Sequence, residues 1–184
     1  MGWRNTRFGY GTGMVALHWL MTAMFIGAYA TTELREYFPK DSPGRAAIMA
    51  WHYTIGLSIL ILAMARLGLR SRGERPEVRP APGRWESAAA AVVHWALYGV
   101  MIGAPVLGWM VLSAEGKPLT YFGLELPPLL GKDKDLGEWF EELHETVGNA
   151  GYFLIGLHAA AALYHHYIRR DNTLGLILPQ RRGS

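Results

Sequence analysis

Histidine is the residue type with the clearest chemical potential in this sequence of 184 residues, which has seven histidines and no cysteine. Six of the histidines lie within stretches that contain no Asp, Glu, Lys or Arg, and the seventh, His144, lies just before such a stretch. A neutral imidazole binds a metal ion or a haem iron, and it handles protons near neutral pH. The lack of cysteine excludes disulfides, thiolate metal clusters and haem attachment through a Cys-x-x-Cys-His motif.

The uncharged stretches that contain these histidines are long enough to cross a membrane. They cover residues 13–32, 46–65, 87–114 and 146–168. A spanning helix needs about 20 mostly apolar residues to cross the hydrocarbon core of a bilayer. We therefore predict an all-α integral membrane protein, a single four-helix bundle over residues 1–184 with up-down-up-down topology.

The fourth helix is expected to begin before its uncharged stretch. Asp135 is a suitable N-cap, and the acidic turn at 136–145 suits the N-terminus of a helix. The predicted spans are about 13–32, 46–66, 87–114 and 138–168.

The Lys and Arg residues divide unevenly between the two sides of this bundle. Twelve lie on the side that holds both termini: Arg4, Arg7, Arg66, Arg70, Arg72, Arg75, Arg79, Arg84, Arg169, Arg170, Arg181 and Arg182. Six lie on the other side: Arg35, Lys40, Arg45, Lys117, Lys132 and Lys134. Because cytoplasmic loops carry the excess of positive charge, both termini are predicted to be cytoplasmic. Since the arginines flank membrane spans, nucleic-acid binding is not expected.

Four histidines lie at matched depths on different predicted helices. His144 and His158 are 14 residues apart, so they lie within about 40° of each other on one helix face and about 21 Å apart along its axis. His52 lies near the outer start of the second span, and His18 near the cytoplasmic start of the first. The depths predict two pairs across the bundle, His52 with His144 and His18 with His158. Facing imidazoles in an apolar bundle suit the two axial positions of a six-coordinate haem b.

Other roles remain open for these and the remaining histidines. A single histidine in a membrane helix often serves as a hydrogen-bond partner between helices. His94 lies at the inner depth and competes with His18 as a ligand, although contact with a haem propionate or a neighbouring helix is the expected role. His165 follows His158 by seven residues on nearly the same face. It is expected to bind a quinone headgroup or a propionate, or else to be a simple interfacial histidine, and His166 is given no role.

The residues around these histidines resemble those of the bacterial cytochrome b561 family, the small four-helix dihaem membrane cytochromes b that include superoxide oxidase. The matching stretches are LHWL around His18, AYATTELREYFPK, WHYTIGLSILILAMARLGLR around His52, and LHETVGNAGYFLIGLHAAAALYHHYIRRDNTL. The family's four haem ligands fall on His18, His52, His144 and His158. The resemblance implies a multi-pass protein of the bacterial inner membrane, with two haems b and ubiquinone as the electron acceptor. For superoxide oxidases it implies that superoxide is oxidised to dioxygen on the outer side.

Three functions follow for this chain. The first is a superoxide:ubiquinone oxidoreductase, in which His165 together with Arg66 or Arg169 holds the quinone and His165 handles its protons. The second is an electron-carrier subunit that links a periplasmic redox partner to the quinone pool. The third is a non-redox membrane anchor or a metal transporter, against which the spans lack any Asp or Glu that would line a cation path. The outer side has eleven acidic and six basic residues, which argues against superoxide unless the basic residues converge on the outer histidine pair.

Overall fold

The computed structural model describes residues 5–178, and most of them are helical. Arg4, Arg181 and Arg182, which contribute to the predicted orientation, lie outside these residues. The elements are α1 (Thr12–Leu34), the 3-10 helix η1 (Arg35–Tyr37), α2 (Pro43–Arg72), α3 (Arg84–Glu115), β1 (Leu119–Tyr121), β2 (Leu124–Leu126), α4 (Lys134–Tyr164), the π-helix η2 (His165–Arg169) and α5 (Thr173–Ile177). The four long helices are each long and apolar enough to cross a membrane, which confirms the predicted four-helix membrane bundle.

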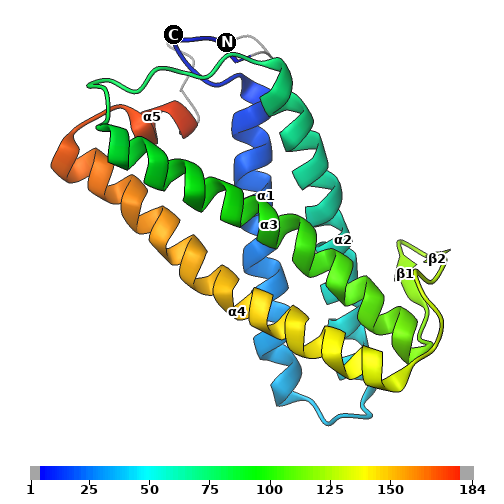
Figure 1. Cartoon of the computed structure of the whole chain (residues 1–184). Coiled ribbons are helices and arrows are strands. Elements are labelled where there is room, and N and C mark those ends of the chain that lie inside the picture. The colour runs from blue at the N-terminus through cyan, green and yellow to red at the C-terminus, as the bar shows by residue number, and fades with distance from the viewer. Residues whose placement is uncertain (1–4, 179–184) are drawn as a thin grey trace, which may run out of the picture.

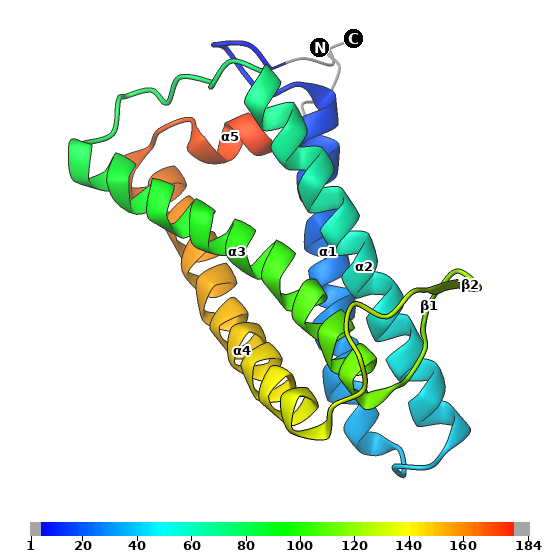
Figure 2. The ribbon, with the colours of Figure 1, turned by 45° about the vertical axis from the view of Figure 1, so that its right-hand side comes forward.

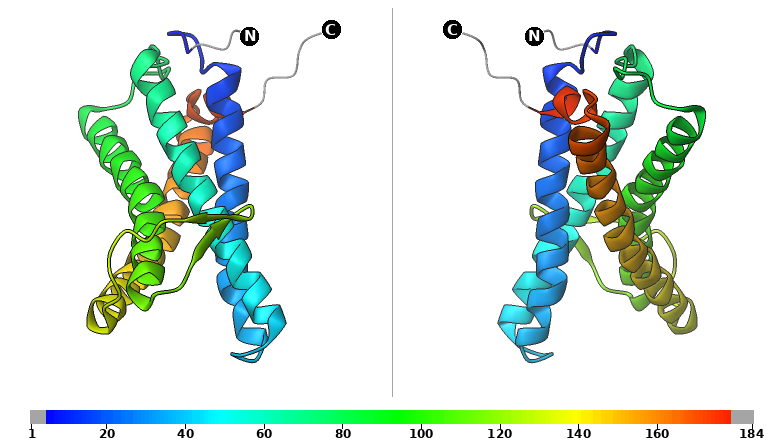
Figure 3. Two further views of the ribbon diagram at one scale, coloured as in Figure 1. Left: turned by 90° about the vertical axis from the view of Figure 1, so that its right-hand side faces the viewer. Right: turned by 90° about the vertical axis from the view of Figure 1, so that its left-hand side faces the viewer.

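Consecutive long helices run in opposite directions and form two helical hairpins. Figure 1 shows α1 beside α2, and α3 beside α4. The two hairpins cross at an angle (Figure 3), and α2 packs against α3 where they meet. The start of α1 and the short helix α5 lie at the same end of the bundle (Figure 1). We call this the α5 end, and the opposite end, which holds η1 and the start of α4, the η1 end.

Local capping sets where the long helices begin. At α2, the side chain of Ser42 accepts a hydrogen bond from the backbone N–H of Arg45, and Pro43 occupies the first turn. At α4, the side chain of Asp133 accepts one from the backbone N–H of Leu136. The predicted cap at Asp135 is therefore wrong, because Asp133 has the extended backbone that a cap requires and Asp135 already lies in the first helical turn.

The loop between α3 and α4 folds back onto the bundle as an antiparallel β-hairpin. Leu119 pairs with Leu126 in its register, and Leu119 is buried against Leu57 of α2 and Leu112 of α3. The Tyr121 hydroxyl lies 3.3 Å from the Ser58 hydroxyl. Figure 2 shows the hairpin beside α2. This hairpin is not predicted from the sequence, because strands of three residues have too little hydrophobic pattern to detect.

Side chains at the α5 end connect the C-terminal segment to α1 and to the loop between α2 and α3. The indole N–H of Trp19 donates to the carbonyl of Ile177 at 2.9 Å. Asn172 accepts a hydrogen bond from the backbone N–H of Arg79 at 2.7 Å and donates its own backbone N–H to the Arg79 carbonyl at 3.2 Å. The end of the bundle that contains His165 is thus closed by contacts between segments distant in the sequence.

A pair of tyrosines joins α1 to α4. The hydroxyl of Tyr29 donates to the carbonyl of Gly148 at 2.9 Å, and its ring lies 3.8 Å from the ring of Tyr152 between centroids. The hydroxyl of Tyr152 in turn donates to Glu33 at 3.0 Å. Tyr29 approaches α4 at Gly151, where an added Cβ would overlap its hydroxyl. The lack of a side chain at Gly151 is therefore what allows this contact between the two helical hairpins.

Candidate functional site

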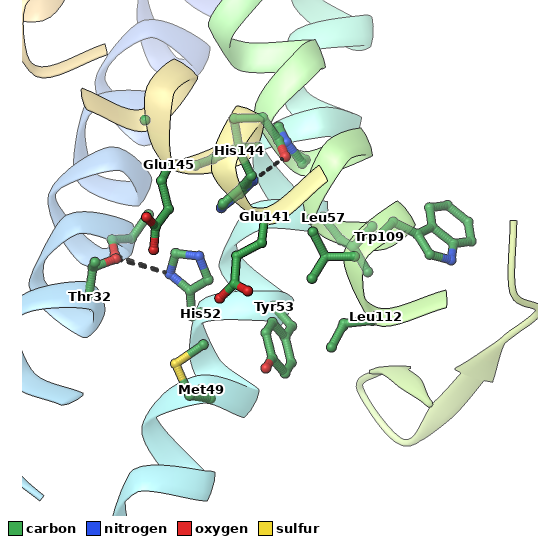
Figure 4. Close-up of a pocket in the computed structure, with 18 of the residues that line it drawn as sticks. Thr32, Met49, His52, Tyr53, Leu57, Trp109, Leu112, Glu141, His144 and Glu145 are labelled. Carbon is green, nitrogen blue, oxygen red and sulfur yellow. Dashed lines mark hydrogen bonds between the residues drawn. The ribbon is translucent and has the colours of Figure 1, made fainter. Parts of the chain in front are cut away.

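His52 on α2 and His144 on α4 face each other near the η1 end, with their ring centroids 6.2 Å apart (Figure 4). Two imidazoles that bind one metal ion from opposite sides have centroids about 6 Å apart, because each metal–nitrogen bond is about 2 Å long and each centroid lies about 1 Å behind its nitrogen. The spacing of this pair, which we call the outer pair, therefore suits two axial ligands of one iron.

Backbone carbonyls orient both rings of the outer pair. The Nδ1 atom of His144 lies 2.9 Å from the carbonyl oxygen of Ala104, and the Nδ1 atom of His52 lies 3.3 Å from that of Ala28. The Thr31 hydroxyl lies 3.1 Å from the same His52 nitrogen. The Thr32 hydroxyl lies 3.5 Å from it (Figure 4). When Nδ1–H donates to a carbonyl, the lone pair is on Nε2, and this arrangement is typical of metal-bound histidine.

A cavity of about 540 Å³ lies between the helices at the outer pair. Its walls include both histidines and the apolar side chains of Phe25, Leu57 and Val100. Gly108 also lines the cavity, and a Cβ added there would lie 3.2 Å from Cε1 of His144. The volume is within the range of about 300–1,000 Å³ that is usual for ligand pockets. Two oriented imidazoles beside apolar side chains fit a haem b, the group predicted from the matched depths of the histidines in the sequence.

The charged residues around this cavity are of both signs. Three of the six basic residues on the outer side line the cavity, namely Arg35, Arg45 and Lys117, whereas Lys40, Lys132 and Lys134 do not. The carboxylate of Glu36 lies 3.0 Å from Arg35 and 3.5 Å from Arg45.

The third basic residue is also paired, whereas two nearby carboxylates are not. Lys117 lies 3.0 Å from Glu115, and this hydrogen bond raises the pKa of Lys117 above its ordinary value. Glu141 and Glu145 also line the cavity (Figure 4), and neither has an ion-pair partner among residues 5–178. The basic residues at this cavity are therefore largely neutralised by neighbouring acids.

The other predicted pair, His18 on α1 and His158 on α4, also comes together. Its ring centroids are 6.2 Å apart, the same separation as in the outer pair. We call this the inner pair. His94 on α3 lies beside it, with its ring centroid 5.4 Å from that of His158. That separation is shorter than two ligands on opposite sides of one iron require, so the geometry favours His18 over His94 as the partner of His158.

His165 lies in η2 at the α5 end, where its ring is held by a carboxylate. Nδ1 of His165 lies 2.5 Å from Oδ2 of Asp171, whose side chain is fully buried. Asp171 also accepts a hydrogen bond from the backbone N–H of Thr173 at 2.9 Å. Burial alone would raise the pKa of Asp171, but the hydrogen bonds from His165 and Thr173 hold it below its ordinary value.

Asp171 is not among the residues predicted from the sequence, although it is the one acidic residue after His165. The other candidate partners of His165 differ in their surroundings. Arg169 forms an ion pair with Glu86 at 3.1 Å, whereas Arg66 has no ion-pair partner in the described part of the chain. His166 is exposed.

Comparison with known proteins identifies similar chains over almost the full length. Residues 9–180 match the family described as prokaryotic cytochrome b561. The chain is 36% identical to cytochrome b561 homolog 1 of Escherichia coli (strain K12), over 91% of this chain and 96% of that protein. It is 35% identical to a Yersinia pestis protein named probable superoxide oxidase CybB, over 95% of this chain and 98% of that protein. It is 26% identical to cytochrome b561 homolog 2 of Escherichia coli (strain K12), over 97% of this chain and 95% of that protein.

Proposed function

The chain belongs to the prokaryotic cytochrome b561 family, and from this membership we propose that it is a superoxide:ubiquinone oxidoreductase of the bacterial inner membrane. Members of this family are haem b proteins that transfer electrons in membranes. The chain is accordingly a multi-pass membrane electron-transfer protein. The finer proposal is that superoxide is the donor on the outer side, and that ubiquinone is reduced near the α5 end.

The observation that carries the proposal is the identical 6.2 Å spacing of the two histidine pairs. His52 and His144 would hold one haem b, and His18 and His158 a second. When bound, the haems supply one-electron carriers near the two faces of the membrane. The chain's own part is to orient the imidazoles, as Ala28 and Ala104 do for the outer pair, and to surround them with apolar side chains.

The α5 end supplies the groups that suit quinone reduction. Two superoxide ions and one ubiquinone give two dioxygen molecules and one ubiquinol, and the reaction consumes two protons. Nδ1 of His165 is held by Asp171, so Nε2 is the atom that would donate a proton to a quinone oxygen. The Lys and Arg distribution supports a cytoplasmic location of this end, so that the protons would come from the cytoplasm.

The proposal is tested with the purified protein in liposomes that contain ubiquinone. Superoxide is generated outside the liposomes, and ubiquinol is measured over time. We expect one ubiquinol for every two superoxide ions consumed, and no ubiquinol when superoxide dismutase is added. A reaction that proceeds only after another redox protein is supplied would contradict direct oxidation of superoxide by this chain.

The two unpaired carboxylates at the outer cavity favour a second candidate, an electron-carrier subunit that receives electrons from a periplasmic redox protein. Glu141 and Glu145 line the outer cavity, and the neighbouring basic residues are paired with acids. Such a surface attracts a positively charged partner better than an anion. Co-purification with a redox protein, and a faster reaction with that protein at low ionic strength, would support this function. The family assignment disfavours the third function, a non-redox anchor or transporter.

Replacement of His165 by alanine is expected to slow ubiquinone reduction by about 100-fold while both haems are retained, because a positioned proton donor contributes about 10²–10⁴-fold. Asp171→Asn should reduce the rate less, since it removes the carboxylate that positions the ring but leaves the imidazole. His166→Ala is the matched control, and it should react as the unmodified protein does. Unchanged quinone kinetics in His165→Ala would remove this residue from the quinone site.

A further inference from the structure

The two histidine pairs are part of a pattern in which each long helix contributes one residue to each of two layers. The outer layer consists of Thr32, His52, Gly108 and His144, and the inner layer of His18, Arg66, His94 and His158. On every helix the two residues are 14 positions apart, which corresponds to about 40° of rotation and about 21 Å of rise. The two layers are thus built on the same plan from different side chains.

Contacts within the layers agree with this spacing. In the outer layer, the Thr32 hydroxyl lies 3.5 Å from His52 (Figure 4). A Cβ added at Gly108 would lie 3.2 Å from Cε1 of His144. In the inner layer, the rings of His18 and His94 both lie beside the ring of His158. Arg66 occupies the corresponding position on α2, 14 residues after His52.

Unlike Arg70 and Arg169, Arg66 has no partner for its charge among residues 5–178. Arg169 is paired with Glu86, and the guanidinium of Arg70 lies over the rings of Trp95 and Tyr98, at 5.4 and 5.5 Å from their centroids. Arg66 is half-buried and forms no ion pair within residues 5–178. A positive charge within a membrane bundle is costly unless an anion accompanies it. The inner layer therefore has a place for a negatively charged group.

We propose that Arg66 binds a carboxylate of the group held between His18 and His158, and that its charge makes this inner haem easier to reduce than the outer one. The inference rests on the proposed function, which puts a haem b, with its two propionate groups, at each pair. The corresponding outer position on α2 is His52, and the outer layer contains no cation.

The charge difference between the layers sets a direction for electron transfer. Reduction adds a negative charge, which a nearby guanidinium stabilises and a nearby carboxylate opposes. Arg66 acts at the inner layer. At the outer layer the cations Arg35, Arg45 and Lys117 are paired with acids, whereas the cavity-lining Glu141 and Glu145 have no ion-pair partner among residues 5–178. Transfer of an electron from the outer haem to the inner haem would therefore lower the free energy. The electron would then leave the protein at the α5 end.

The test is a spectroscopic redox titration of Arg66→Gln and Arg66→Lys, with haem per chain measured in each. Arg66→Gln is expected to lower the reduction equilibrium constant of one haem at least tenfold, which is a shift of about 59 mV for one electron. Arg66→Lys, which keeps the charge, should recover most of this shift. Arg72→Gln, an exposed change on the same helix, is the matched control and should shift neither haem.

Combining Arg66→Gln with the removal of one histidine pair identifies the haem that shifts. The shift should persist after His52 and His144 are both replaced by alanine, and it should vanish after His18 and His158 are both replaced. Loss of the inner haem alone from Arg66→Gln, with its retention in Arg66→Lys, would support the binding role equally.

Three results would overturn the proposal. They are unchanged potentials in Arg66→Gln, an equal shift in Arg72→Gln, and loss of both haems from both Arg66 variants. If the unmodified chain holds two haems, any of these results would contradict the role of Arg66 and leave the proposed function intact. An unmodified chain that does not bind two haems would instead contradict the proposed function, and this inference with it.

Discussion

Replacement of His144 by alanine is expected to leave a protein that holds one haem per chain instead of two. Among residues 5–178, His144 and His52 are the imidazoles that line the outer cavity, so the outer haem would lose one of its two ligands. His18 and His158 remain about 21 Å away along the bundle. Oxidation of superoxide should fall to the background rate. Haem per polypeptide, measured from the spectrum of the reduced protein, checks the first result, and the ubiquinol assay checks the second.

Double variants test the pairing itself. His52→Ala with His144→Ala removes both members of one pair and should leave one haem. His52→Ala with His158→Ala removes one member of each pair and should leave none. His166→Ala is the control, with two haems expected. If the two double variants retained the same amount of haem, the pairing of His52 with His144 and of His18 with His158 would be wrong.

Gly151→Leu is expected to destabilise the bundle by about 1–3 kcal/mol, the usual cost of inserting extra atoms into a packed site. An added Cβ at this position would overlap the hydroxyl of Tyr29 and lie 3.2 Å from Cγ1 of Val100. Tyr29 has little room to move, because its ring lies against the ring of Tyr152 and its hydroxyl donates to the carbonyl of Gly148. The thermal unfolding midpoint of the purified protein measures the effect.

A second glycine on the same helix provides the control for this change. A Cβ at Gly156 would meet nothing within 4 Å, so Gly156→Leu should leave the unfolding midpoint nearly unchanged. Gly151→Ala should be partly rescued by Tyr29→Phe, which removes the hydroxyl that the Cβ would overlap. Equal stability of Gly151→Leu and Gly156→Leu would show that the close approach of Tyr29 to α4 is not needed.

The long helices and the two histidine pairs could be predicted because they depend on local sequence. The uncharged stretches mark the spans, and a spacing of 14 residues determines both the face and the depth of two histidines on one helix. The start of α4 was less predictable, since Asp133 and Asp135 are both acceptable caps by residue type and only the backbone conformation distinguishes them.

The features that were missed depend on contacts between distant segments or on irregular backbone. The β-hairpin forms because Leu119 is buried between α2 and α3, which a pattern of three residues does not reveal. Asp171 reaches His165 because the chain passes through a π-helix and then through Arg170 in the left-handed conformation. The pairing of Arg35, Arg45 and Lys117 with acids likewise depends on side-chain positions, so the charge available to an incoming anion could not be counted from the sequence.

The division of the bundle into two helical hairpins has a consequence for how the protein matures in the cell. Each histidine pair takes one residue from the α1–α2 hairpin and one from the α3–α4 hairpin. Each hairpin can enter the bilayer as a unit, since its helices pack mainly on each other. A haem bound at either pair would then fasten the two halves together. Newly made chains that receive no haem would remain loosely associated and open to membrane proteases, so the haem supply of the cell would set how much of the protein accumulates.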